Sequence, residues 1–448
     1  MHKGLYNFTV FGINCKKKSL YLLGDKMIIV VNRGETVYEI SNRYSVPVEK
    51  IIADNGVLQE ILVVGQSLWL DEAEQSISFD TNKTVNEVSI EYGIEEKTLF
   101  RNNFYLRGRQ NIPRNSYLVL SYRNNPDTQK IIGGYAYDFI GTDRLYSVIN
   151  YLTYIMPFTY GFTPEGTLIP PDDTYILSVA NQYGVKSLLH ISTLTEDGYF
   201  DSNLPSYVFD DENVQNILID NLLSEVISKG YDGVDIDFEY LTSMQKEGYI
   251  TFTKQLSEAL HEIDKILVIA VPPITSGEQQ GILVDGIDYA GLGENADYIL
   301  IMAYEYGYRF GPPLAIAPVN QIRRVLDYAV TVIPRQKILL GISNYGYNWT
   351  LPYIQGESDA PSISTVEAIE LAKKYGAEIQ FDDTAKAPFF IYTDEQGKIH
   401  EVWFEDARSF QAKMDLINEY NLSGGFIWDL MRENPQGFVT INSAVDIL

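Results

Sequence analysis

Residues 231–240 read YDGVDIDFEY and place carboxylates at Asp235, Asp237 and Glu239, on alternate positions of an otherwise apolar run. Side chains alternate between the two faces of a β-strand, so the three acids share one face and the apolar residues between them share the other. Like charges held close together in a water-poor site raise one another's pKa. The row therefore favours general acid chemistry over a purely structural role.

The order of apolar and helical segments around this stretch predicts an α/β protein with an eight-stranded (β/α)8 barrel. Eight apolar runs of strand length, from IIGGYAY at 131–137 to GGFIWDL at 424–430, alternate with helical segments across residues 128–448. An open doubly wound sheet is the alternative, but no G-x-G-x-x-G follows the first run. Glu239, at the end of the fourth strand, would lie on the face where barrel active sites form. A small α+β insertion is expected at about 379–405, before the last strand.

A weak internal repeat precedes the barrel: residues 34–55 align with 82–103 at an offset of 48. Each copy has β-like segments on both sides and two short helical patterns between them, which predicts two βααβ modules, at 27–72 and 76–122. The polar segment 121–130 is interpreted as a linker. Residues 1–26 are interpreted as a tail without a role in the fold. The coincident positions are Thr36/Thr84, Val37/Val85, Glu39/Glu87, Ser41/Ser89, Tyr44/Tyr92 and Asn55/Asn103.

Composition narrows the classes of partner. The formal net charge of -26 argues against nucleic acid, because phosphate binding needs clustered Lys and Arg. Cys15 stands alone, so no intramolecular disulfide is possible. No apolar run reaches 18 residues, so we expect no membrane span. The N-terminus lacks the apolar core and small-residue cleavage site of a secretory signal.

Two other interpretations of the carboxylate row stay open. A solvated surface strand has the same spacing, although Val234, Ile236 and Phe238 on the opposite parity disfavour it. Stacked carboxylates can also hold Mg²⁺ or Ca²⁺. Only four histidines are present, and His190 alone falls on a predicted barrel strand. We therefore expect neither a metal nor a cofactor.

The pattern Asp232-x-x-Asp235-x-Asp237-x-Glu239 resembles the signature of glycoside hydrolase family 18, the chitinase-like barrels. In this family the 2-acetamido group of the substrate is the nucleophile. The resemblance implies that Glu239 protonates the glycosidic oxygen and later activates water. It further implies that Asp237 orients the acetamido nitrogen, that Asp235 shares a proton or hydrogen bond with Asp237, and that Asp232 is structural.

Two later strand ends resemble the same family. IMAYEYG, at 301–307, is similar to the Met-x-Tyr-Asp segment and implies that Met302 and Tyr304 point inward, with Tyr304 bonding the acetamido carbonyl. Glu305 takes the place of the expected Asp. Trp428 matches the tryptophan that forms the apolar floor beneath the reacting sugar.

The N-terminal repeats resemble LysM modules, which bind glycans containing N-acetylglucosamine, such as peptidoglycan and chitin. The match rests on GETVYEIS from residue 34 and LVVGQSLWL from residue 62, and it implies glycan contacts by Gly34, Glu35, Gly65 and Gln66. The second copy carries Asn82-Lys83 and Arg114-Asn115 at those loops. Modules that act as spacers, or as adaptors for a protein partner, are the alternative.

Three further segments, at 304–319, 344–353 and 401–409, resemble the spore germination glycosylases of endospore formers. This resemblance implies a retaining endo-β-N-acetylglucosaminidase that cuts cortex peptidoglycan during germination, with Trp403 in one wall of the glycan groove. It also implies synthesis in the mother-cell cytoplasm without a cleavable signal peptide, a place at the boundary of spore coat and cortex, and contact with coat proteins. A chitinase and a non-catalytic, peptidoglycan-binding coat protein are the alternatives.

Overall fold

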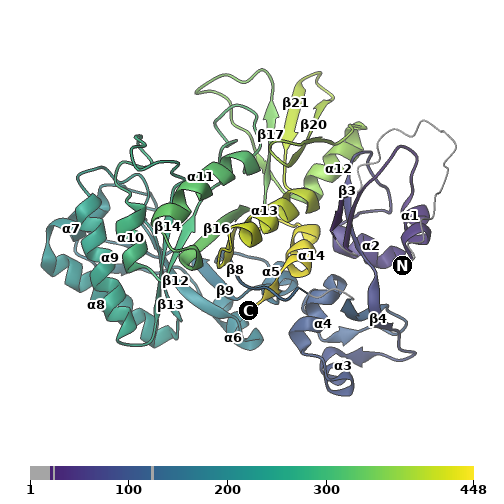
Figure 1. Ribbon diagram of the computed structural model, residues 1–448, viewed down its shortest axis with the longest axis horizontal. Coiled ribbons are helices and arrows are strands. Elements are labelled where there is room, and N and C mark those ends of the chain that lie inside the picture. The colour runs from purple at the N-terminus through teal and green to yellow at the C-terminus, as the bar shows by residue number, and fades with distance from the viewer. Residues whose placement is uncertain (1–20, 24–25, 123–125) are drawn as a thin grey trace, which may run out of the picture.

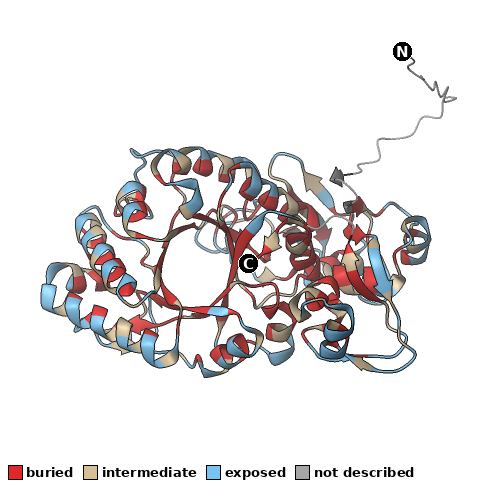
Figure 2. Cartoon of the chain, turned by 60° about the horizontal axis from the view of Figure 1, so that its bottom comes forward, coloured by how far each residue is buried: buried red, intermediate tan, exposed pale blue. Residues whose placement is uncertain are grey.

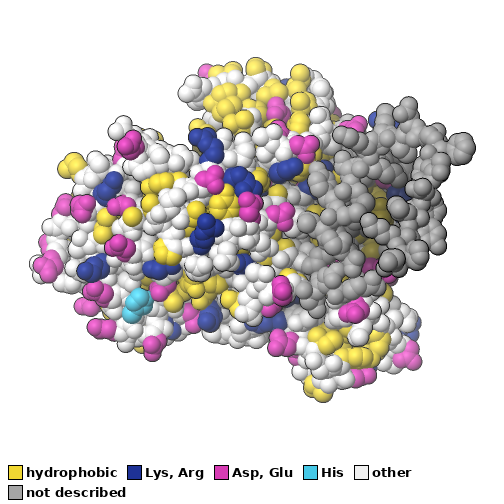
Figure 3. Space-filling view, in the orientation of Figure 1, with side chains coloured by type: hydrophobic (Ala, Val, Ile, Leu, Met, Phe, Trp, Pro, Cys, Tyr) yellow, Lys and Arg dark blue, Asp and Glu magenta, His cyan; other side chains and the backbone are white. Residues whose placement is uncertain are grey.

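The computed structural model describes residues 21–23, 26–122 and 126–448. Two small repeats, purple and blue in Figure 1, lie beside a larger barrel that carries an insertion. Within the described part of the chain, no helix is long and apolar enough to cross a bilayer. Figure 3 shows basic and acidic side chains interspersed on one face, with hydrophobic side chains gathered over the insertion and over the second repeat.

Eight parallel strands form the barrel, as predicted, and the last strand pairs with the first to close the ring (Figure 2). Each strand overlaps one of the eight predicted runs, and β8 begins two residues before its run at 131–137. The strands are β8 (Gln129–Tyr137), β9 (Tyr154–Phe158), β12 (Lys186–Ser192), β13 (Gly233–Asp237), β14 (Ile266–Val271), β15 (Tyr298–Ile301), β16 (Ile338–Ser343) and β22 (Gly424–Trp428).

Helices surround this ring of strands (Figure 2). They are α5 (Thr142–Ile149), α6 (Thr174–Tyr183), α7 (Leu204–Asp210), α8 (Glu212–Lys229), α9 (Lys246–His261), α10 (Tyr289–Asn295), α11 (Val319–Val332), α13 (Ala407–Glu419) and α14 (Pro435–Ala444). Short elements join them: β10 (Gly161–Phe162), β11 (Leu168–Ile169), the 3-10 helix at Arg335–Lys337, and β23 (Asp446–Ile447), which pairs with the start of β8.

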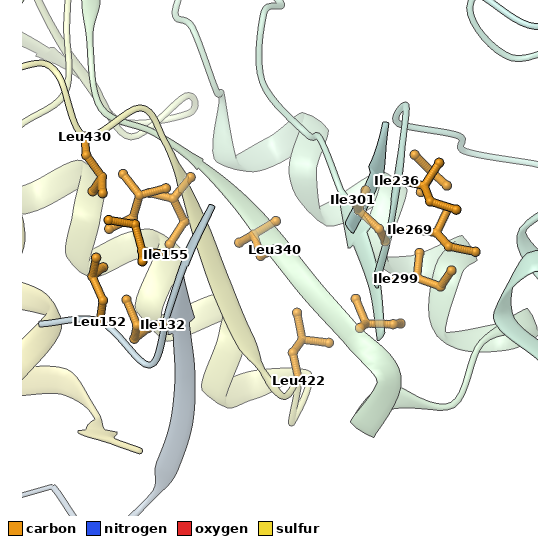
Figure 4. Close-up of a cluster of buried hydrophobic side chains, with 14 of the residues drawn as sticks. Ile132, Leu152, Ile155, Ile236, Ile269, Ile299, Ile301, Leu340, Leu422 and Leu430 are labelled. Atoms are coloured by element: carbon orange, nitrogen blue, oxygen red, sulfur yellow. The ribbon is translucent and has the colours of Figure 1, made fainter. Parts of the chain in front are cut away.

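Alternation along the strands produces two apolar layers. One parity points outward and packs under the helices, as Ile132, Ile155, Ile236, Ile269, Ile299 and Leu340 do in Figure 4. The other parity fills the barrel with side chains that include Tyr135, Met156, Leu188, Val268, Leu300, Leu339 and Phe426. Burial of both layers removes most strand side chains from water, which is the main stabilising contribution to such a core.

The insertion is a five-stranded antiparallel sheet with one helix, and it begins well before the expected residue 379. Its elements are β17 (Gly346–Thr350), β18 (Ser362–Ile363), α12 (Thr365–Tyr375), β19 (Gln380–Asp382), β20 (Ala387–Thr393) and β21 (Ile399–Trp403). β17 follows a barrel strand almost directly, so its residues resemble a continuation of that strand. Its pairing with β21, about 50 residues later, is a long-range contact that local periodicity does not reveal.

Both repeats have the predicted βααβ order. The first contains β2 (Lys26–Val30), α1 (Val37–Tyr44), α2 (Val48–Asn55) and β3 (Ser67–Asp71). The second contains β4 (Ala73–Ile77), β5 (Lys83–Thr84), α3 (Val85–Tyr92), α4 (Glu96–Asn102), the 3-10 helix Phe104–Leu106, β6 (Asn111–Ile112) and β7 (Leu118–Tyr122). β1 (Tyr21–Leu23) lies in the segment interpreted as a tail and pairs with β2. The rest of that segment before Lys26, and residues 123–125 of the predicted linker, lie outside the described residues.

The repeats pack on the barrel through shared buried side chains. Trp69 of the first repeat and Tyr122 of the second belong to the same apolar cluster as the outward face of the barrel strands. Between these rings, the ammonium of Lys50 lies 2.5 Å from Asp54 and also donates to the carbonyl of Asn102. The ion pair is buried where the first repeat meets the second.

Candidate active site

The carboxylate row lies at the end of β13 with the predicted parity. Val234, Ile236 and Phe238 belong to the apolar layer under the helices. Asp235 is fully buried inside the barrel, while Asp237 and Glu239 are half-buried at its rim. The backbone alternation of one strand therefore presents three acids to one interior line.

Asp235 is held by two side chains that the sequence analysis did not assign to the site. The hydroxyl of Tyr135 donates to its Oδ2 at 2.8 Å, and Nδ1 of His190 lies 2.7 Å from the same oxygen. His190 is the direct register partner of Asp235 on β12. Both residues occupy inward-facing positions of their strands, the first and third of the barrel, and that alternation in the sequence could have identified them. Oδ1 of Asp235 and Oδ1 of Asp237 are buried and have no hydrogen-bond partner within the described part of the chain.

A cavity of about 630 Å³ opens over the row. Five of the residues expected at the catalytic centre line it: Asp237, Glu239, Met302, Tyr304 and Trp428. The other lining residues are Tyr137, Phe158, Ser192, Thr193, Phe200, Ser202, Tyr240 and Glu305. Trp428 is braced by the edge of Phe158, with 4.9 Å between ring centres, so its indole is a fixed apolar wall. The cavity combines an aromatic wall, acids and a phenol, which is the chemistry of a sugar site.

Burial controls the protonation of this cavity. It raises the pKa of Asp237 well above its usual range, and the nearby charges of Glu239 and Asp235 raise it further. Burial also raises the pKa of Glu239, with the charge of Glu305 as the second cause. The pKa of the Tyr304 phenol is raised well above its usual range by burial and by the same acids, so its hydroxyl remains a donor. The site can thus present a protonated carboxyl and a neutral phenol together.

Glu305, which replaces the expected Asp, also faces the cavity. Its backbone has a φ of 60°, and its carboxylate accepts hydrogen bonds from the hydroxyls of Tyr345 and Tyr347. Burial raises the pKa of Glu305, and these two hydrogen bonds partly offset that rise. Glu305 therefore acts on the site through its charge and through two tyrosines of the β16–β17 segment. In the described residues, no three His, Cys, Asp or Glu side chains are grouped so that they could share a metal ion.

Trp403 lies apart from the catalytic cavity. Its ring stacks on Phe389 at 4.5 Å, and its Nε1 donates to Glu401 at 2.8 Å. Its register partner on β17 is Tyr347. Trp403 thus packs within the sheet of the insertion, against the cluster that contains Tyr345 and Tyr347, and is not among the residues that line the cavity.

The four residues expected to contact glycan in the first repeat have different surroundings. Gly34 is exposed, whereas the Glu35 carboxylate already accepts bonds from Asn32 and from Arg43 at 2.6 Å. Gly65 and Gln66 are buried where the repeat meets the insertion. A cavity of about 780 Å³ borders Gly65 at this junction. Any ligand that reached Gly65 would therefore also meet the insertion.

Comparison with known proteins identifies the barrel. The profile of Glycosyl hydrolases family 18 matches residues 150–433. The chain belongs to glycoside hydrolase family 18. The LysM domain profile matches residues 29–71, which places the first repeat in that class of module.

Relatives within family 18 extend over most of the chain. The Cortical fragment-lytic enzyme of Bacillus anthracis is 32% identical over 92% of this chain and 96% of its own length. The Cortical fragment-lytic enzyme of Bacillus subtilis (strain 168) is 38% identical over 66% of this chain and 69% of its own length. The crystal structure of the spore cortex-lytic enzyme SleL of Bacillus megaterium QM B1551 matches with a TM-score of 0.79 at 32% identity, covering 94% of this chain and 98% of that one.

Proposed function

We propose that this family 18 hydrolase cleaves N-acetylglucosaminyl bonds of spore cortex peptidoglycan during germination, as a retaining endo-β-N-acetylglucosaminidase. The observation that carries the proposal is the cavity in which Glu239, Asp237 and Tyr304 face the aromatic wall of Trp428. The names of full-length relatives, cortical fragment-lytic and spore cortex-lytic enzymes, support cortex as the substrate. We also propose that the enzyme is located at the boundary of spore coat and cortex and that coat proteins are among its partners.

In the first step the protonated Glu239 gives its proton to the glycosidic oxygen while the bond from that oxygen to C1 breaks. The carbonyl oxygen of the sugar's 2-acetamido group attacks C1 and closes an oxazolinium ring. Tyr304 donates a hydrogen bond to this carbonyl oxygen and orients it. Trp428 supports the apolar face of the reacting sugar.

In the second step Glu239, now ionised, takes a proton from water as that water attacks C1 and opens the ring. Two inversions at C1 retain the configuration. Asp237 accepts the acetamido N–H, and its charge stabilises the positive ring. A proton shared between the two unpartnered Oδ1 atoms of Asp235 and Asp237 would satisfy both. Tyr135 and His190 hold the other oxygen of Asp235, which positions this pair.

The decisive variant is Glu239→Gln, which keeps the size of the side chain but cannot transfer a proton. We expect turnover of purified cortex glycan to fall about 10³-fold, since positioned general acids contribute on the order of 10²- to 10⁴-fold. Glu258→Gln, on the exposed face of α9, is the matched control. Mass spectrometry of the wild-type products identifies the bond that is cut.

Products with N-acetylglucosamine at the new reducing end support the proposed bond. Products with muramic acid at the new reducing end contradict it. A Glu239→Gln variant that releases fragments at the wild-type rate contradicts the mechanism. Cleavage of chitin oligosaccharides without cleavage of cortex glycan would instead favour the chitinase interpretation.

We further propose that the first repeat binds insoluble glycan and retains the enzyme on cortex. The LysM profile match over residues 29–71 supports this role. The cavity between this repeat and the insertion is a candidate place for the glycan, since it borders the exposed loop at Asn32 and Arg33 as well as Gly65. Point variants in the full chain suit the test better than deletion, because Trp69 and Tyr122 belong to the shared core.

A further inference from the structure

A second cavity, of about 480 Å³, adjoins the catalytic one. Tyr137 and Trp428 line both cavities, so the two cavities, here called the first and second chambers, lie next to each other at these rings. Glu239 and Tyr240 line only the first chamber. Because Glu239 protonates the bond that breaks, the leaving part of the glycan lies on its side of Trp428. The chamber on the other side therefore receives the sugar attached to O4 of the reacting unit.

Aromatic residues make the second chamber suitable for a sugar. Phe139 is 72% exposed and stacks on Tyr137, with 5.2 Å between ring centres. Tyr345 and Tyr347 line the same chamber from the β16–β17 segment. Exposed, braced rings present a flat apolar face on which a pyranose can lie.

Arg432 contributes a positive charge to the second chamber. Arg432 is half-buried, and its Nη2 donates a hydrogen bond to the hydroxyl of Ser362 at 2.6 Å. No carboxylate of the described residues lies within ion-pair distance of its guanidinium, although the chain has 60 acids and 34 Lys and Arg. Guanidinium has five N–H donors in a fork that matches a carboxylate. Most of these donors are therefore available to a ligand.

Asp429 is the acid that lines this chamber beside Arg432. It accepts a bond from the backbone N–H of Met431 at 2.8 Å. Burial raises the pKa of Asp429, and this hydrogen bond and the charges of Arg432 and Arg144 offset only part of the rise. The acid thus has its own partner and a reduced tendency to ionise. It does not neutralise Arg432 in the way that a direct ion pair would.

We propose that Arg432 binds a carboxylate carried by the O3 substituent of a muramic acid unit in the second chamber. This inference rests on the proposed function, since N-acetylglucosamine alternates with muramic acid in peptidoglycan and the unit on O4 of the reacting sugar is then muramic acid. The lactyl ether of that unit ends in a carboxylate, or in an amide to L-alanine that carries its own carboxylate. Muramic lactam and chitin lack this charge. Arg432 is thus a residue that selects among peptidoglycan units, while Ser362 orients its guanidinium.

The test compares two glycans that differ only in charge. Soluble oligosaccharides of alternating N-acetylglucosamine and N-acetylmuramic acid are used with the free lactyl carboxylate, and again after its conversion to the primary amide. We expect wild-type kcat/KM to be at least 10-fold higher for the carboxylate form. In Arg432→Gln that ratio falls to about 1, and in Arg432→Lys part of it returns because the positive charge remains. Backbone contacts are not disturbed, since Asn344 and Arg144 bond the carbonyl of residue 432.

A third glycan, with L-alanine on the lactyl group, shows whether Arg432 binds the lactyl carboxylate or the carboxylate of L-alanine. Dependence on Arg432 with either carboxylate supports the proposal and identifies the source. A ratio that is the same in wild type and Arg432→Gln overturns it, even if both proteins cut cortex glycan normally. If the wild-type enzyme cuts neither muramyl glycan but does cut chitin oligosaccharides, the proposed function fails and this inference fails with it.

Discussion

The two repeats share their internal framework and differ in what their loops face. In both, a threonine and a glutamate form a capping box at the start of the first helix: Thr36 with Glu39, and Thr84 with Glu87. In both, a buried asparagine joins the second helix to the last strand: Asn55 to Trp69, and Asn103 to Val119. The residues that made the repeat visible in the sequence therefore serve the fold.

The loop before the last strand has opposite surroundings in the two repeats. In the first, Val64 accepts a backbone bond from Ile379, and Gly65 is pressed against the insertion. In the second, Arg114 and Asn115 are exposed. The loop at Gly65 and Gln66, which matches the LysM pattern, is covered by the insertion of the barrel. The corresponding loop at Arg114 and Asn115, which departs from that pattern, is exposed. The difference teaches that a loop motif predicts a contact only when its tertiary neighbours are known.

The largest effect should come from Gly65→Ala. A Cβ at Gly65 would lie 1.8 Å from the carbonyl oxygen of Ile379, and the backbone φ of +84° already disfavours any side chain. We expect a loss of about 3 kcal/mol or more in the free energy of unfolding, from overpacking and strain together. Urea denaturation measures the loss, and proteolysis between repeat and barrel reports whether the junction opens.

Gly34→Ala is the matched control, because φ is +85° at Gly34 and nothing lies within 4 Å of the added Cβ. Only the conformational cost remains, about 1 kcal/mol. Equal losses in the two variants would mean that Gly65 is not packed against the insertion, and the contrast between the repeats would then disappear.

The next effect tests what the repeats share. Asn55→Ala removes two donated bonds, to the carbonyls of Ile51 and Trp69 at 2.9 Å, and one accepted from the N–H of Trp69. Asn103→Ala removes the corresponding three bonds. Each change leaves buried backbone groups without partners, so each should cost about 2 to 3 kcal/mol in urea denaturation. A large loss for one variant and none for the other would show that the shared framework is not equally stabilising.

Strand periodicity predicted the barrel and its inward row of carboxylates, because a two-residue repeat fixes which side chains face inward. Asp235, Asp237 and Glu239 needed only local sequence, and Met302, Tyr304 and Trp428 followed from the family resemblance at strand ends.

The remaining features depend on contacts between distant segments. Tyr135 and His190 act on Asp235 from two other strands, so no local pattern marks them. Trp403 was expected in the glycan groove. It stacks on Phe389, its register partner on β20, and it also pairs with Tyr347 of the distant strand β17. Gly65 is similar, since its neighbour Ile379 lies more than 300 residues away. Tertiary pairing decides these positions, and one sequence does not reveal it.

The smallest expected effect tests whether the open part of the first repeat binds glycan. Gly34→Asn makes the substitution that the second repeat carries at Asn82, and asparagine tolerates a positive φ better than other side chains do. In a Glu239→Gln background, which prevents digestion, we expect retention on insoluble cortex to fall about three- to tenfold, or about 1 kcal/mol. Gly93→Asn is the control, because Gly93 also has a positive φ and open space but lies at a helix end of the second repeat. A loss confined to Gly34→Asn would locate glycan binding at the first repeat's open loop. Unchanged retention would instead make the two repeats equivalent as spacers, and their different loops would then reflect only which of them packs against the catalytic part.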